Sequence, residues 1–561
     1  MLFDFVADKN KNLLQNLSKP MNHIDNSHLI LGNNAIVQLN LIDSDMQNQD
    51  NSIKYKSLFH VINQTSTAQG ERFLKSLLIS PITSEIELRK IYDMTEEMIK
   101  YDFWKNVEKY LVAIHDVERM ERKVGLNTIR PNEFVSLVNS YENICDLADI
   151  LSKKTKLTLL RDLPPEKKII QKIKMMIADV KNTFDITELT KYGNLELKTL
   201  IFKEKIHEDL DKLNDNVDQG HTLMEKLRMT LIGFLDVKSK SISNSSIVIQ
   251  NNSREGYYLK LTNSRAKILS QKISGLKSIE LEGHKTIDPK ILIFKEIGNS
   301  TKIYFPSLDH KADGITDYYD QIESLNKKYY LEYISNLFKT YGPELKICSN
   351  FVTKIDYLKS CAKMVRLYNY VRPIIDKKEY GYVVADKLRH PIVERIIDYE
   401  YIPHNISIGT DTLKGMLIYG LNSSGKSILM KSIGMAIIMA QAGLFVPANK
   451  FTFSPYNSLY TRITGNDNIF KGLSSFALEI VELNSILKRA DTKTLVIGDE
   501  VCRGTEHISG NAIVATSIIK LSELRATFIF ATHLHDISSL EEITSLKNVK
   551  SFHLKVDYDV K

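Results

Sequence analysis

The chain has 561 residues, of which 43% are hydrophobic and 25% are charged, and its formal net charge is +7. The composition is that of an ordinary globular protein, and the length exceeds what one hydrophobic core usually holds, so we expect several domains. No segment reaches the roughly 18 uninterrupted apolar residues of a membrane span, which argues against a membrane partner. The modest positive charge permits a nucleic-acid partner without requiring one.

Cysteine usage and the amino terminus point to the cell interior. The first twelve residues lack the basic start and the apolar core of a signal peptide. The cysteines lie far apart and form no metal-type pair, which predicts a reducing compartment and no zinc site. They are Cys145, Cys348, Cys361 and Cys502.

Helical periodicity dominates the first part of the chain. Residues 1–56 form an N-terminal segment that ends in a polar run, residues 57–125 are helical in pattern, and residues 131–165 predict short helices. The range 195–235 predicts a long helix, because apolar residues recur in alternating steps of four and three. These residues are Ile206, Leu210, Leu213, Val217, Met224, Leu227, Leu231 and Phe234, with Gly220 at the missing position. Such a seam fits either a lever arm or a helix packed in a bundle.

The pattern changes between residues 241 and 305. Alternating segments separated by Asn, Ser and Gly predict strands, and basic residues outnumber acidic ones. This basic unit could contact a phosphate backbone, or its charges could be a solvated face. A second helical stretch follows over residues 315–341. Two long helical segments therefore flank the basic strands, like an outgoing and a returning arm.

From residue 380 onward the pattern is that of a parallel sheet with crossover helices. Apolar runs at 416–419, 495–498 and 527–531 each lead into a turn containing Gly, Asp or His and then into a helix. The predicted fold class is therefore multidomain α+β, with an α/β domain in the last third.

A phosphate-binding motif follows the first of these runs. Its glycines allow backbone N–H groups to surround phosphates, Lys426 would neutralise the outer phosphates, and the Ser427 hydroxyl could ligate Mg²⁺. The motif follows a strand and opens a helix, as nucleotide binding requires. It consists of Gly420, Leu421, Asn422, Ser423, Ser424, Gly425, Lys426 and Ser427, with Ile428 next in the helix.

The other two apolar runs end in residues suited to hydrolysis. Asp499 would lie beside metal-bound waters, and Glu500 could polarise an attacking water. His533 is placed to sense a terminal phosphate, although a lone histidine is more often structural. His535 completes an H-x-H without further ligands, so we predict no metal site there.

One more segment, residues 465–480, lies between the phosphate loop and the acidic strand. ATP-binding-cassette ATPases carry a helix-capping signature at this place, which completes the site of the partner subunit. Ser474 and Ser475 would supply hydroxyls and helix N-terminal N–H groups to a γ-phosphate. The segment therefore predicts a composite site that requires two subunits.

With these motifs in place, the chain resembles the MutS family of DNA mismatch-repair ATPases. The matching segments occur in the same order as in the family and cover nearly the whole chain from Ser57. The sequences of 465–476 and 498–506 are similar to those of the branch found in mitochondria and large viruses. The matching segments are 57–82, 115–125, 254–264, 370–373, 388–394, the phosphate loop with Asn422, 443–448, 472–476, 499–506 and 530–533.

The resemblance implies a division of labour along the chain. It assigns a helical lever domain to 57–240, a DNA clamp to 241–305, returning lever helices to 306–373 and a P-loop ATPase of ABC type to 374–561. It implies ATP and Mg²⁺ as ligands, an intracellular, DNA-associated location, and three kinds of partner: double-stranded DNA, a second copy or a related ATPase in a dimer, and downstream repair factors. Tyr401 would stack on adenine, and the phosphate contacts of the clamp would be Lys260, Arg265, Lys267 and Lys272.

Some residues depart from the family pattern. Leu421, Ser423 and Ile428 stand where the family usually has Pro, Met and Thr, and none of them removes a phosphate-binding group. Cys502 replaces a glycine, and we expect it to alter the turn without touching phosphate chemistry.

Both ends of the chain also depart from the pattern. Mismatch-sensing members carry a Phe-x-Glu wedge in an N-terminal domain, whereas only about 56 residues precede the lever domain here. The triplets at 202–204 and 294–296 fall in the lever helix and near the clamp, so we interpret them as chance matches. The chain stops in what should be a late strand of the ATPase, so we expect this domain to be incomplete.

Three functions fit these observations. The first is a mismatch-repair DNA clamp that hydrolyses ATP to switch its grip on DNA. The second is a mismatch-blind relative acting on recombination junctions, which the missing wedge would favour. The third is a structural DNA-binding scaffold with weak ATPase activity. Against it argue the intact residues Lys426, Ser427, Asp499, Glu500 and His533. The sequence does not choose between the first two.

Overall fold

The computed structural model describes residues 27–32, 34–43, 55–235, 246–252, 256–281, 286–305, 315–421, 424–463, 475–502 and 507–555. Across these ranges we find no helix with the length and apolar character that a membrane crossing needs. The chain forms two compact units. The first consists of Met1–Lys109, Thr155–Leu163 and Thr353–Lys561, and the second of Tyr110–Lys154 and Pro164–Val352.

A parallel sheet is the centre of the first unit. Its strands at positions 416–419, 495–498 and 527–531 were predicted, and all three are confirmed. They are buried along their whole length, as continuous apolar runs in a parallel sheet should be. In sheet order the described strands are β1 (Ile30–Gly32), β11 (Ser458–Ile463), β12 (Thr494–Asp499), β13 (Thr527–Ala531), β9 (Gly415–Tyr419) and β14 (Val549–His553).

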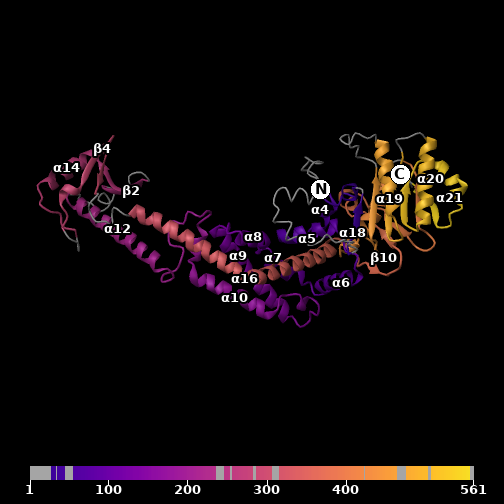
Figure 1. The fold of residues 1–561 in the computed structure, drawn as a ribbon, viewed down its shortest axis with the longest axis horizontal. Helices are drawn as coiled ribbons and strands as arrows, with labels where there is room; N and C mark the ends of the chain where they lie inside the picture. Colours follow the sequence, from indigo (N-terminus) through magenta and orange to yellow (C-terminus); the bar gives the residue numbers. More distant parts are fainter. Residues whose placement is uncertain are drawn as a thin grey trace, which may run out of the picture. The chain divides into compact units, whose positions relative to one another are not determined.

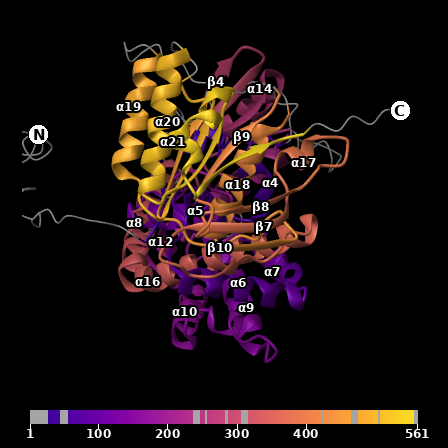
Figure 2. The same ribbon diagram turned by 90° about the vertical axis from the view of Figure 1, so that its right-hand side faces the viewer.

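Helices cover both faces of this sheet. Helix α18 (Lys426–Gln441) lies on the face of Ile497, because its Gly434 would bring a Cβ within 2.9 Å of that side chain. Helices α19 (Ser475–Arg489) and α20 (His507–Glu523) lie side by side (Figure 2). They pack on the opposite face, where Val496 and Phe528 join their side chains in one buried cluster. Helix α18, which follows the phosphate loop, and the expected signature helix α19 are therefore on opposite faces of one sheet.

The remaining elements of the first unit surround this core. A second sheet contains, in order, β6 (Ile374–Ile375), β10 (Lys450–Ser454), β7 (Tyr382–Leu388) and β8 (His404–Ile408). The helices are α3 (Ala35–Gln38), α4 (Leu58–Ile62), α5 (Ala68–Ile79), α6 (Glu85–Lys100), α7 (Trp104–Leu111, which extends into the second unit), α17 (Val393–Ile396) and α21 (Glu541–Thr544).

The second unit combines helices with an antiparallel sheet. Helix α12 (Glu208–Gly233) leads to this sheet (Figure 1), and α16 (Ile315–Tyr368) belongs to both units. The other helices are α8 (Val117–Gly125), α9 (Pro131–Lys153), α10 (Lys167–Thr183) and α11 (Ile186–Thr190). The sheet contains β2 (Val248–Asn252), β3 (Gly256–Thr262), β5 (Ser300–Tyr304) and β4 (Ile293–Ile297), with helix α14 (Asn263–Ser274) against it.

Several predicted boundaries in this unit were wrong. Helix α9 is a single helix of 23 residues rather than several short ones. Pro131 is tolerated in it because it occupies the first turn, where no backbone N–H is needed. Helix α12 begins at Glu208 rather than 195, and Phe202 pairs with Phe184 in a β-bridge before it, so the triplet at 202–204 lies outside the helix. Helix α16 continues through Pro343 to a length of 54 residues.

The strands predicted between 241 and 305 are confirmed, but α14 was not predicted. Its buried residues Ala266, Leu269 and Ile273 recur at helical spacing. The basic residues around them obscured this pattern.

Candidate nucleotide site and basic sheet

The phosphate loop joins β9 to α18. Gly425 has a φ of 94°, a left-handed conformation that glycine adopts without steric cost, and it caps the helix N-terminus. The Lys426 ammonium donates hydrogen bonds to the carbonyl oxygens of Gly420 at 2.6 Å and of Leu421 at 3.0 Å. The lysine is only 6% exposed, so its charge lies inside the curve of the loop.

This loop suits a phosphate group. The buried Ser424 hydroxyl has no hydrogen-bond partner within the described ranges. Ser424 belongs to the loop that leads to Lys426, just before the N-terminus of the 16-residue helix α18. Such a combination of donors is an anion site. Asn422 and Ser423 lie outside the described residues, whereas Leu421 and Ile428 are exposed.

The two predicted metal ligands lie together. The Ser427 hydroxyl donates a hydrogen bond to Asp499 Oδ2 at 2.5 Å. Burial raises the pKa of Asp499, and the hydroxyl of Ser427 and the charges of Lys426 and Lys431 oppose this rise. A hydroxyl and a carboxylate fit Mg²⁺ if phosphate oxygens and waters supply the other ligands. The described part of the chain contains no group of three His, Cys, Asp or Glu side chains able to hold a metal.

The two predicted catalytic residues also lie together. His533 Nε2 is 2.9 Å from Glu500 Oε1, and the Glu500 amide donates to the Ala531 carbonyl at 2.9 Å. This second bond ties the end of β12 to the end of β13. Glu500 has a φ of 50°, so the chain leaves the strand sharply at this residue. The side chain of His535 lies outside the described residues.

Sequence reasoning missed one cation in this site. Lys431 is half-buried, burial lowers its pKa, and the charge of Asp499 raises it. It follows Ser427 by four residues in α18, and this spacing places the two side chains on one face of a helix. That spacing was the available signal.

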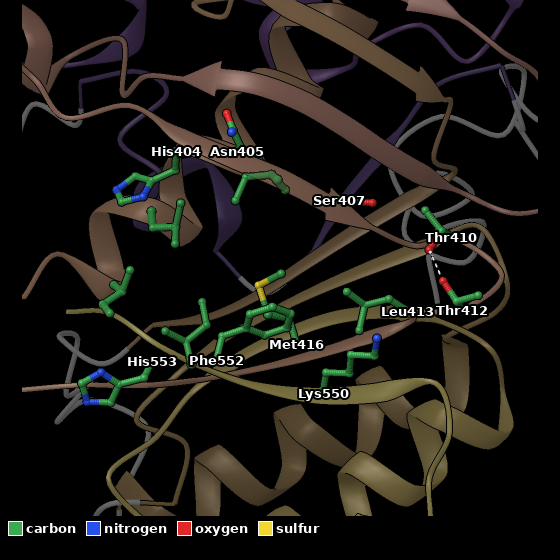
Figure 3. A pocket seen from close by; sticks show the side chains of 14 residues that line it. His404, Asn405, Ser407, Thr410, Thr412, Leu413, Met416, Lys550, Phe552 and His553 are labelled. Carbon is green, nitrogen blue, oxygen red and sulfur yellow. Dashed lines mark hydrogen bonds between the residues drawn. The ribbon is translucent and has the colours of Figure 1, made fainter.

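A cavity of about 410 Å³ lies beside the phosphate loop, lined by β8, β9 and β14 (Figure 3). Leu554 lines the cavity, and its amide donates a hydrogen bond to the carbonyl of Tyr419, the residue before the phosphate loop, at 3.0 Å. His404 and His553 lie at the same end of it (Figure 3). Tyr401 does not line this cavity. It is half-buried, burial raises its pKa, and Ser432 of α18 opposes this rise.

The predicted signature residues are only partly visible. Ser474 lies outside the described residues, and Ser475 begins α19 with a side chain that also lies outside them. The hydroxyl positions that would meet a partner's nucleotide therefore stay a prediction.

The predicted DNA-contacting residues do not form one surface. Lys260 pairs in register with Lys302, and Lys302 pairs with Lys295, so three lysines cross β3, β5 and β4 on one face of the antiparallel sheet. Thr301 points to the opposite face and donates a hydrogen bond to Asn263 of α14 at 2.9 Å. The other predicted contacts lie on that helix: Arg265, Lys267 and Lys272. We call Lys260, Lys302 and Lys295 the lysine row.

Known proteins are similar to this chain over nearly its full length. Residues 34–362 match MutS domain III, and residues 416–561 match MutS domain V. A protein of Acanthamoeba polyphaga mimivirus, named as a mutS homologue of DNA mismatch repair, is 37% identical over 606 residues, covering 100% of this chain and 54% of its own length.

Two further relatives come from a mitochondrion and a bacterium. The mitochondrial DNA mismatch repair protein mutS homologue of Sarcophyton glaucum is 30% identical, covering 99% of this chain and 54% of that protein. The DNA mismatch repair protein MutS of Caldanaerobacter subterraneus is 28% identical, covering 99% of this chain and 59% of that protein. The chain thus spans little more than half the length of these relatives. The chain belongs to the MutS family.

Proposed function

We propose that the chain is an ATP-dependent DNA-binding protein of DNA mismatch repair, which hydrolyses ATP to change its grip on duplex DNA. The names of its relatives support the repair role. The observation that carries the ATPase proposal is one cluster at the carboxyl edge of the parallel sheet, where Lys426, the Ser427–Asp499 pair and the Glu500–His533 pair meet.

Each residue has a distinct task in this proposal. Lys426 binds the outer phosphates of ATP, and Ser427 with Asp499 would hold Mg²⁺, which neutralises phosphate charge when bound. Glu500 orients a water and takes its proton, while His533 holds the Glu500 carboxylate through the contact at 2.9 Å. Lys431 offsets the charge of Asp499 when the site is assembled.

The base of the nucleotide has two candidate places. The cavity beside Leu554 is large enough for a purine and has histidine rings from two strands at one end. Tyr401 offers an aromatic ring closer to α18. Comparing ATP affinity in Tyr401→Ala and His553→Ala distinguishes them, because removing a stacking ring costs about 1–3 kcal/mol.

We assign the DNA contact to the antiparallel sheet. In the same proposal, residues 57–240 and 306–373 form the lever, residues 241–305 form the DNA clamp and residues 374–561 form the ATPase domain. The lysine row presents three positive charges across adjacent strands, which suits a phosphate backbone. Pairing of two ATPase domains, with the signature segment of one completing the site of the other, is part of the same proposal.

A mismatch-blind role at recombination junctions is the second candidate. The phenylalanines of the two Phe-x-Glu triplets differ: Phe202 is 5% exposed with its ring centroid 4.7 Å from that of Phe184, and Phe294 is half-buried in β4 opposite the buried Ile303. The Phe202 ring is therefore not available to a base stack. This observation favours a grip on the DNA backbone.

Substitution of Lys426 tests the proposed function. Lys426→Ala should weaken binding of a fluorescent ATP analogue about 10- to 100-fold, since hydrogen bonds to charged groups contribute about 1.5–3 kcal/mol. Lys450→Ala, which removes an exposed lysine of β10, is the control and should bind like the wild type. Equal affinities in wild type and Lys426→Ala would overturn the assignment of the phosphate site.

A further inference from the structure

The turn after the acidic pair is strained. Glu500 and Cys502 both adopt left-handed backbone conformations, with φ values of 50° and 63°. Residues with a Cβ incur a steric penalty there, so neighbouring groups must hold them in place. Because Glu500 bears the proposed base, whatever holds this turn also sets the position of the carboxylate.

A buried glutamate from another element holds the turn. Glu479 of α19 is 4% exposed, and its Oε1 accepts a hydrogen bond from the Cys502 amide at 2.9 Å. A buried carboxylate needs a counter-charge, which Arg462 of β11 supplies with its Nε 3.4 Å from the same oxygen. Arg462 also reaches Glu482, one turn further along α19, with its Nη1 at 3.6 Å.

Glu479 is on the wrong face of the sheet for a direct role with phosphate. Arg462 pairs in register with Gly498 and its side chain faces α19, while the residue after Gly498, Asp499, points toward Ser427 of α18. Side chains of successive strand residues point to opposite faces. Glu479 therefore acts on the chemistry only through the backbone of the turn.

We propose that Glu479 is a positioning residue for ATP hydrolysis: it fixes the turn 500–502 and couples the position of α19 to that of Glu500. This inference rests on the proposed ATPase function. Helix α19 begins at Ser475, in the segment expected to meet the nucleotide of a partner chain. A displacement of α19 when a partner engages therefore moves the hydrogen-bond acceptor of Cys502, and with it the base.

Three variants of the full chain separate this role from general packing. Glu479→Gln keeps an acceptor oxygen for the Cys502 amide, whereas Glu479→Asp keeps the charge beside Arg462 but withdraws the oxygen by one methylene. Glu482→Ala is the matched control, because it removes a carboxylate of the same helix that pairs with the same arginine.

We expect Glu479→Asp to lower kcat for ATP about 10- to 100-fold, as a misplacement of about 1 Å can do, while the Kd of the nucleotide stays within about threefold. Glu479→Gln and Glu482→Ala should keep kcat within about threefold. Equal losses in Glu479→Asp and Glu482→Ala, or parallel changes of kcat and Kd, would reduce Glu479 to a packing role and overturn the proposal.

A second readout does not depend on turnover. Amide hydrogen exchange of the segment that contains Cys502 should be faster in Glu479→Asp than in wild type, and unchanged in Glu482→Ala. Unchanged exchange in Glu479→Asp overturns the inference even if the wild type hydrolyses no ATP. Absence of hydrolysis by the wild type would instead overturn the proposed function.

Discussion

The proposed nucleotide site and the lysine row hold their charged groups in different ways. In the proposed nucleotide site two charged groups are buried and paired: Lys426 is 6% exposed and hydrogen-bonded within its loop, and Asp499 is 6% exposed and bonded to Ser427. In the lysine row, Lys295 is exposed and Lys260 and Lys302 are half-buried on an open sheet. Anion binding in the proposed nucleotide site would depend on the exact positions of a few groups, whereas in the lysine row it would depend on the sum of the charges.

This difference predicts how each region responds to substitution. Removing one buried and positioned group disables a step, because no neighbouring side chain can take its place. Removing one exposed lysine weakens an electrostatic sum, and the other charges remain. Large single effects should therefore be confined to the nucleotide site.

The largest effect is expected from Glu500→Ala. Loss of the base should lower the rate of ATP hydrolysis about 10²- to 10⁴-fold, while binding of a fluorescent ATP analogue stays near the wild-type affinity. Rapid-quench hydrolysis and equilibrium titration measure the two quantities. Hydrolysis at the wild-type rate would remove Glu500 from the mechanism.

A buried carboxyl in the helical unit extends the contrast to stability. Burial raises the pKa of Glu121 to about 7, although a hydrogen bond from the Tyr141 hydroxyl opposes the rise. The folded state therefore holds this proton more tightly than the unfolded state. The protonated Glu121 carboxyl therefore adds to the free energy of unfolding below about pH 4.5. This stabilisation, about 3 kcal/mol, is lost as the pH rises through about 7.

Glu121→Gln should abolish this part of the pH dependence in urea titrations between about pH 4.5 and about pH 7.5, a range that spans the ordinary and the raised pKa. Glu118→Gln, on the same helix but half-exposed, should only reduce the dependence, because the charge of Glu118 adds to the rise in the pKa of Glu121. If Glu121→Gln and wild type show the same slope, the carboxyl is not protonated in the folded state.

A smaller effect is expected from the lysine row. Replacing Lys260, Lys302 and Lys295 by alanine should lower the slope of log affinity for duplex DNA against log salt by about 2.7, or about 0.9 for each phosphate that is no longer neutralised. The matched control replaces Arg265, Lys267 and Lys272 of α14, on the other face of the sheet. If that control lowers the slope and the lysine-row variant does not, the DNA site lies on the helix side.

The smallest effect concerns the bases themselves. We expect this chain to bind homoduplex DNA and single-mismatch DNA with affinities that differ by less than about tenfold, or about 1.4 kcal/mol. The reason is that the lysine row carries no aromatic ring to insert into the base stack, and the ring of Phe202 is buried against that of Phe184. Titration of both duplexes at one salt concentration measures the ratio, and a clear preference above tenfold would indicate an aromatic wedge elsewhere in the chain.

Short-range rules were enough to predict which residues of the proposed nucleotide site lie together. Glycine spacing, a preceding apolar strand and strand-end carboxylates all act within a few residues, and the shared edge of a parallel sheet brings Ser427 to Asp499 and Glu500 to His533. The contact between Glu479 and Cys502 joins a helix to a turn through tertiary packing, and no local pattern signals it.

Two features of the second unit could not be predicted from local patterns, the lysine row and the full length of α16. Lys260, Lys302 and Lys295 become neighbours only once β3, β5 and β4 are paired, and a shift by one residue would turn each lysine to the other face. The full length of α16 was missed because Pro343 predicts a break, whereas burial of Leu345, Cys348 and Phe351 carries the helix past it.

The most direct test joins the two regions in one experiment. The steady-state rate of ATP hydrolysis is measured with and without duplex DNA, for wild type and for the variant lacking the lysine row. If ATP hydrolysis at the Lys426–Glu500 site is coupled to DNA binding, duplex DNA should change the wild-type rate of hydrolysis severalfold. In the variant, the ratio of the rate with DNA to the rate without DNA should stay near one. The same DNA-dependent ratio in both proteins would contradict a link between the lysine row and the nucleotide site.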